Sequence, residues 1–196
     1  MPARYGLEDF TADVRAVVSK QVSPAEILRA IGPSFKQLLA NRSFLQEKVK
    51  ELNATGDEVF LYDDPDYHFV VLARGVSRGQ SHAGTPHDHG TLWALYGIYE
   101  GTAHFQRYEI DPTSSAGPFP GLRMISETAA KPGDFDAIEP GNMHLPVFPP
   151  EGGSVIIVVY QRDLDSVVRR GYLRDIQQPV KFQGQFATHE TRVEQR

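Results

Sequence analysis

The spacing of apolar positions changes character at about residue 52 of the chain. Before this point apolar residues recur every three or four positions, which is the period of an amphipathic helix. The stretch Ser23 to Glu26, with the sequence SPAE, is a capping box with proline at the first helical position, so we expect a second helix to begin there. The positions that define the two helices are Phe10, Val14, Val17 and Val18, then Ile27, Ile31, Phe35, Leu38 and Leu39.

From about Glu58 onward, apolar residues gather in short runs separated by clusters of Gly, Pro and Asp, which predicts about seven strands. Because no helical pattern intervenes, the sequence favours an antiparallel sandwich or barrel over a parallel sheet. We therefore expect a helical segment at 1–52, a β-barrel at 53–180 and a polar tail at 181–196. The expected strands fall at 58–62, 68–76, 91–99, 102–110, 121–130, 133–140 and 154–161.

Composition narrows the class of protein. The 196 residues with 40% hydrophobic content suffice for one domain with a substantial core. The net charge of -5 comes from interspersed charges without a basic run, so nucleic acid is not an expected partner. The chain has neither a long apolar stretch nor an apolar region behind its first residues, so we expect no membrane span and no signal peptide, and a cytoplasmic location.

The histidines carry the candidate chemistry. The chain has 7 histidines and no cysteine, so a metal ion must be held by nitrogen or oxygen. His87 and His89 stand two positions apart, and side chains at that spacing on a strand point the same way. His144 follows the Pro140 to Gly141 turn at the start of another strand. Together the three histidines are candidate ligands for one ion.

Two stretches resemble the motifs of the cupin superfamily. HDHGTLWALYGIYEG, from His87 to Gly101, resembles the first motif, and KPGDFDAIEPGNMHLPVF, which contains His144, resembles the second. Glu139 and Phe148 stand where the second motif usually has proline and asparagine. The resemblance implies a mainly β fold, a cupin double-stranded β-helix or jelly-roll barrel, in which both motifs converge on one metal ion.

The first motif lacks the glutamate that most metal-binding cupins add after the second histidine, since Trp93 and Ala94 occupy those positions. Such a three-histidine set resembles the thiol dioxygenases, the cysteine dioxygenase type I family and its relatives that act on 3-mercaptopropionate. That resemblance implies an Fe(II) cofactor, with Zn or Ni possible in purified protein, and two substrates: O₂ and a small thiol, which is converted to a sulfinate.

Tyr160, sixteen residues beyond His144, matches the catalytic tyrosine of that family, but Ile156 and Val158 replace the serine and histidine that precede it. Tyr160 is therefore either catalytic or an ordinary strand tyrosine. The family cross-links a cysteine near position 94 to this tyrosine in its mammalian members, and Ala94 excludes that link.

The substrate-binding candidates depend on which face of each strand lies inside. Glu58 falls where the family has a group that binds the substrate carboxylate, and Arg74 is a replacement for that group if it faces the cavity rather than solvent. Three further residues are candidates for lining the site, although a half-exposed strand position is the alternative for the histidine among them: Trp93, Tyr96 and His104.

Two other functions remain open. A three-histidine site also suits Zn²⁺, which would serve a lyase, isomerase or hydrolase reaction. Loss of the serine and histidine before Tyr160 is also compatible with a metal-dependent cupin that binds a small molecule without turnover. Oxygen consumption separates the first of these alternatives from a dioxygenase.

Overall fold

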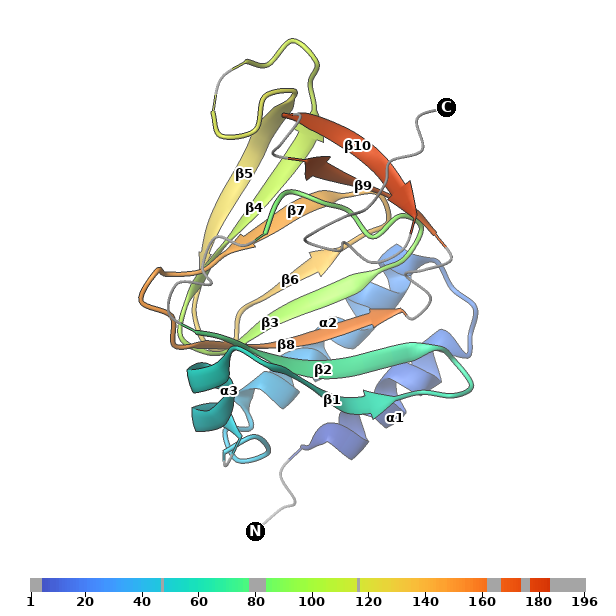
Figure 1. Cartoon of the computed structure of the whole chain (residues 1–196). Helices are drawn as coiled ribbons and strands as arrows, with labels where there is room; N and C mark the ends of the chain where they lie inside the picture. The colour runs from blue at the N-terminus through green and yellow to red at the C-terminus, as the bar shows by residue number, and fades with distance from the viewer. Residues whose placement is uncertain are drawn as a thin grey trace.

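The computed structural model describes residues 5–46, 48–77, 84–115, 117–161, 167–173 and 177–183 (Figure 1). The N-terminal segment forms the helices α1 (Leu7–Val18), α2 (Pro24–Ala40) and α3 (Val49–Thr55). The predicted capping box is confirmed, because the Ser23 hydroxyl accepts from the Glu26 amide and the Glu26 carboxylate accepts from the Ser23 amide. None of the described helices is both long enough and apolar enough to cross a membrane.

The strands confirm the mainly β prediction, and every strand pair within the described ranges is antiparallel. The bounds in the described residues are β1 (Glu58–Asp63), β2 (Phe69–Val76), β3 (Ala94–Glu100), β4 (Ala103–Ile110), β5 (Leu122–Ala130), β6 (Phe135–Ile138), β7 (Met143–Val147), β8 (Ser154–Gln161), β9 (Val168–Leu173) and β10 (Gln178–Gln183).

The strand order is that of a jelly roll. One sheet has the order β1-β2-β8-β3-β6, and another has the order β5-β4-β7. An isolated bridge from His87 to His144 adds the segment around His87 beside β7. Without β1, the eight segments in chain order are β2, the His87 segment, β3, β4, β5, β6, β7 and β8. By their number in this order, the first, eighth, third and sixth segments form one sheet. The second, seventh, fourth and fifth form the other. This is the double-stranded β-helix of the cupins.

The five-stranded sheet has a different core on each face, because successive residues of a strand point to opposite sides. Helices α2 and α3 pack on its outer face, where α2 contacts β3 and α3 contacts β2. Residues of β2 and β8 that face the helices are Phe69, Val71, Ala73, Val155, Ile157 and Val159. Residues of the same strands that face the barrel interior are Leu72, Val76, Ile156, Val158 and Tyr160.

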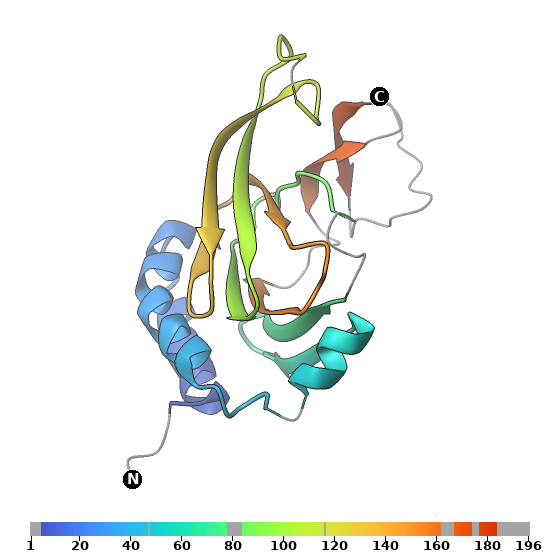
Figure 2. The same ribbon diagram turned by 90° about the vertical axis from the view of Figure 1, so that its left-hand side faces the viewer.

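Two strands were not foreseen from the sequence. β9 and β10 pair with each other, and Gly171 of β9 forms a bridge to His87, so this hairpin extends the second sheet beyond the jelly roll. In Figure 2 the hairpin lies on the opposite side of the barrel from α1 and α2. β10 begins in the expected barrel segment, and its last three residues, 181–183, fall in the expected polar tail; the remaining tail residues, 184–196, lie outside the described part.

Candidate metal centre

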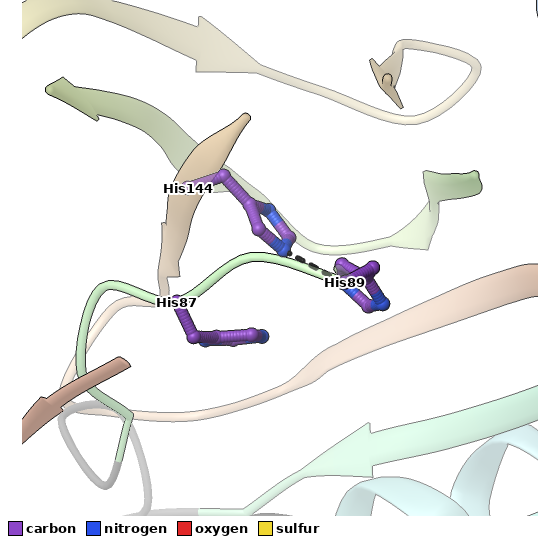
Figure 3. Close-up of side chains that lie close together, drawn as sticks. All are labelled: His87, His89 and His144. Carbon is purple, nitrogen blue, oxygen red and sulfur yellow. Dashed lines mark hydrogen bonds between the residues drawn. The ribbon is translucent and has the colours of Figure 1, made fainter. Parts of the chain in front are cut away.

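The three candidate ligands come from two neighbouring segments of the second sheet. His87 and His144 exchange both backbone hydrogen bonds, His87 N to His144 O at 3.0 Å and His144 N to His87 O at 2.8 Å. Such a pair of residues lies directly opposite in an antiparallel ladder. His89 follows His87 by two positions, so all three imidazoles reach the barrel interior (Figure 3).

The three rings offer ligand nitrogens that all lie within 4.8 Å of one another. The Nε2 atoms of His89 and His144 are 3.2 Å apart, which Figure 3 shows as a dashed line. Two ring nitrogens that bind one ion at right angles, each at about 2.1 Å, lie about 3 Å apart. The residues present therefore fit a divalent ion, with a small rotation of the rings for the widest pair.

The protonation of the rings also suits a cation. Burial lowers the pKa of His87 to about 4, and burial lowers the pKa of His89 and of His144 well below the ordinary value of 6.5. The rings are therefore neutral near pH 7. Nδ1 of His87 lies 2.9 Å from the Thr85 carbonyl oxygen, and a proton donated there leaves its Nε2 bare for a metal.

The turn that carries His87 and His89 is held by strand β9. Asp88, which is only 2% exposed, forms a 2.6 Å ion pair with Nε of Arg170 and accepts a hydrogen bond from the Arg170 amide. The Asp88 carbonyl oxygen accepts a 2.9 Å hydrogen bond from Nε of Arg169. These bonds fix the orientation of the two histidines on either side of Asp88.

A chamber of about 440 Å³ opens from His89 and is lined by both charged substrate-binding candidates. Glu58 and Arg74 line it, and so do the candidates Tyr96 and Tyr160. Arg74 and Glu58 are both exposed to solvent, so they stand at the open side of this chamber. Arg74 borders it because it stands two positions after Leu72, on the same strand face. The structure thus brings four of the expected residues to one cavity beside the histidines.

The sequence analysis missed Arg169, which lines the same chamber and is 4% exposed. Its positive charge adds to the effect of burial in lowering the pKa of each of the three histidines. A signal was present in the sequence, because adjacent arginines on a strand point to opposite faces and one of Arg169 and Arg170 must face inward. Recognising it required identifying β9 as a strand.

A second, smaller cavity of about 150 Å³ touches His87. Arg74, Tyr96 and Ile156 line both cavities and therefore stand between them. Most of the remaining wall of the small cavity is apolar, from Val76, Leu145, Pro146 and Phe148. The candidate metal centre is thus approached by a polar chamber at His89 and by a smaller, more apolar one at His87.

Two expected lining residues are not brought to the centre. Trp93 is 1% exposed and belongs to the core between the five-stranded sheet and the helices, on the opposite face from the cavity. The His104 side chain is 54% exposed, and its Nδ1 lies 3.8 Å from the Glu127 carboxylate on the outer surface of β4. Alternation along the chain explains both positions. Ala94, next to Trp93, lies opposite the inward Tyr160. Phe105, next to His104, belongs to the barrel core.

No family model matches the chain, and no curated protein matches it. Solved structures resemble it in part. A cupin-2 domain containing protein from Shewanella frigidimarina is 14% identical, with a TM-score of 0.42 over 63% of this chain and 99% of its own. An uncharacterized conserved protein with a double-stranded beta-helix domain from Klebsiella pneumoniae is 19% identical, with a TM-score of 0.39 over 58% and 85%. The DMSP lyase DddQ from Ruegeria pomeroyi is 15% identical, with a TM-score of 0.38 over 56% and 48%.

These likenesses concern the fold and carry no argument about the reaction. The fold is evident from the strand order of the chain itself: a cupin-type double-stranded β-helix with a helical N-terminal segment packed on one sheet.

Proposed function

We propose that the protein is a mononuclear Fe(II) dioxygenase of the thiol-dioxygenase type, acting on a small thiol that also carries an acidic group. The observation that carries this proposal is the neutral set of three imidazoles beside a chamber that contains two guanidinium groups. In the described part of the chain, no carboxylate belongs to the ligand group.

The three neutral imidazoles determine which further ligand a bound metal ion favours. Three imidazoles leave the full charge of a divalent ion uncompensated, which favours an anionic donor such as a thiolate in a remaining position. A bound iron(II) ion supplies the redox chemistry by which a thiol and O₂ combine to a sulfinic acid, with both oxygen atoms on sulfur and no outside reductant. His87, His89 and His144 would hold the ion.

The charges of the chamber favour an acidic substrate. Arg74 and Arg169 contribute two positive charges and Glu58 one negative charge among the described lining residues. A guanidinium attracts a carboxylate, and the attraction by Arg169 is the stronger one because Arg169 is buried. We therefore expect 3-mercaptopropionate and related mercapto acids to bind better than the amine cysteamine.

Tyr160 is the candidate for a hydroxyl that contacts the substrate. It points into the barrel with Ile156 and Val158, the residues that replace the serine and histidine of the thiol dioxygenases. Ile156 and Val158 present apolar side chains at the two positions where that family has hydrogen-bonding ones. The Tyr160 hydroxyl lines the chamber, where it would contact the substrate or an oxygen derived from O₂.

An oxygen-electrode assay tests the reaction. The protein is reconstituted anaerobically with Fe(II) and mixed with O₂ and 3-mercaptopropionate, cysteine or cysteamine. We expect oxygen uptake only when a thiol is present, formation of the sulfinate, and no uptake by the His144→Ala variant. Lack of uptake with every thiol, in protein that holds one equivalent of iron, would exclude the dioxygenase.

One contact favours a second candidate, a zinc-dependent lyase or isomerase. The Tyr96 hydroxyl lies 3.4 Å from Nε2 of His89, so a phenol stands beside the metal ligands where it can exchange a proton with a bound substrate. Burial raises the pKa of Tyr96 to about 12, which keeps the hydroxyl protonated at pH 7. Turnover of a non-thiol by the Zn²⁺ form without oxygen uptake would support this candidate, whereas ligand binding without any turnover would indicate a binding protein.

A further inference from the structure

Arg107 of β4 and Asp136 of β6 form an ion pair inside the barrel. Nη2 of Arg107 donates to Oδ1 of Asp136 at 2.5 Å and to the Ala137 carbonyl oxygen at 2.7 Å. The two side chains are 19% and 13% exposed. Because β6 is the last strand of the five-stranded sheet and β4 belongs to the other sheet, this pair joins the two sheets across the interior.

Each member of the pair is also the cross-strand neighbour of a residue at the metal centre. Arg107 lies directly opposite His144 in the β4–β7 ladder, and Asp136 lies directly opposite Tyr96 in the β3–β6 ladder. Direct partners project from the same face of a sheet, with Cβ atoms about 5 Å apart. The Tyr96 and His144 rings are 4.8 Å apart, so the four residues form a closed circuit of contacts.

The surroundings of the pair affect its charge. Burial raises the pKa of Asp136, and the neighbouring Arg107 charge opposes that rise. A buried ion pair adds little net stability compared with an apolar pair of the same shape, so its value lies in the arrangement that it fixes. Here that arrangement is the spacing between the strand of His144 and the strand of Tyr96.

We propose that Arg107 and Asp136 are positioning residues for the metal centre, and that their ion pair sets the place of the His144 imidazole and the Tyr96 hydroxyl relative to the ion. The proposal rests on metal binding by the three histidines, but not on the dioxygenase reaction. Arg107 lies outside both stretches that resemble cupin motifs, and Asp136 lies within the second stretch, at a position to which the resemblance assigns no role.

Co(II) is the probe, because its visible absorption spectrum reports the geometry of its ligands. The variants are Arg107→Met, which removes the pair, Arg107→Lys, which keeps the charge, and the double variant Arg107→Met with Asp136→Leu, which leaves no buried unpaired charge. We expect Co(II) to bind about tenfold more weakly to Arg107→Met and to the double variant, each with an altered spectrum, and we expect Arg107→Lys to restore part of both.

The matched control is Arg15→Met, because Arg15 pairs with the buried Asp64 beneath helix α1, away from the histidines. This control should lower the melting temperature and leave the Co(II) spectrum unchanged. If Arg107→Met does not fold, the double variant decides. An unchanged Co(II) affinity and spectrum in the folded double variant would overturn the proposal. Wild-type protein that binds no Co(II) would overturn it together with the metal centre, whereas Co(II) binding without thiol oxidation by the iron form would overturn the reaction alone.

Discussion

Glu58 and Arg74 are direct cross-strand partners in the β1–β2 pair, and both line the chamber that reaches His89. Opposite charges therefore stand side by side in the wall of this chamber. A second guanidinium group, that of Arg169, lines the same chamber. The sign of the local charge thus depends on single residues, which makes selectivity testable by neutral substitutions.

The first prediction concerns this selectivity. Arg74→Gln should raise KM for an acidic thiol such as 3-mercaptopropionate by about ten- to a hundredfold, because a charged hydrogen bond worth about 1.5 to 3 kcal/mol is lost. Glu58→Gln should leave binding of the acid intact or improve it, and should raise KM for cysteamine by a similar factor. Steady-state kinetics of both variants on both thiols make the comparison. Equal KM values for wild type and both variants would show that neither side chain contacts the substrate.

The second prediction is that each of the three histidines is needed for metal binding but not for folding. His144→Ala should lose the bound ion and retain its strands, because the two barrel cores consist of other residues. Metal analysis and circular dichroism measure the two properties. A ligand that binds only the folded state raises the melting temperature, so added Zn²⁺ should stabilise wild type and not this variant. His104→Ala, at an exposed position, is the control and should keep the metal.

The sequence was sufficient for the fold class and for the three histidines because both depend on local patterns. Helical spacing and the capping box define α2, and the turn glycines place His144 at the start of β7. The faces of strands were harder to derive. Alternation groups Arg74 with Leu72, but only the packing of helices α2 and α3 on the other face shows that Leu72 faces the barrel core and that Arg74, which is exposed, borders the chamber.

The residues that the sequence analysis missed come from contacts between distant segments. Arg169 reaches the chamber because β9 pairs with the His87 segment, 84 positions away in the bridge from His87 to Gly171. Arg107 and Asp136 are 29 positions apart and meet only when the two sheets close. Trp93 was placed in the cavity by its nearness to His89 in sequence, whereas its strand position turns it toward the helices.

The third prediction separates the two roles of Tyr160. If its hydroxyl contacts the reacting atoms, Tyr160→Phe should lower kcat by about a hundredfold with bound metal and melting temperature unchanged. Tyr108→Phe removes a buried tyrosine's hydroxyl that donates to Gln106 instead of lining the chamber, and it should keep full activity. Equal kcat values for Tyr160→Phe and wild type would make Tyr160 a structural residue.

The last prediction tests whether the contact between Arg15 of helix α1 and the buried Asp64 stabilises the fold. Asp64, whose side chain is fully buried, accepts hydrogen bonds from Arg15 of α1, from the Tyr62 hydroxyl and from the amides of Asp66 and Tyr67. Burial by itself raises the pKa of Asp64, but these donors outweigh it and hold the pKa below the ordinary value of 3.8. The ionised carboxylate therefore favours the folded state.

Asp64→Asn should lower the free energy of unfolding at pH 7 by about 1.5 to 3 kcal/mol, the range for hydrogen bonds to a charged group. Because the folded-state pKa is the lower one, the stabilisation is fully present above the unfolded-state value and is lost as the pH falls through the folded-state pKa. The difference between wild type and variant, measured by urea denaturation, should thus shrink below about pH 4. Asp66→Asn, which removes the exposed partner of the same arginine, should change stability little at any pH. A difference that grows on acidification would contradict the assigned direction of the pKa shift.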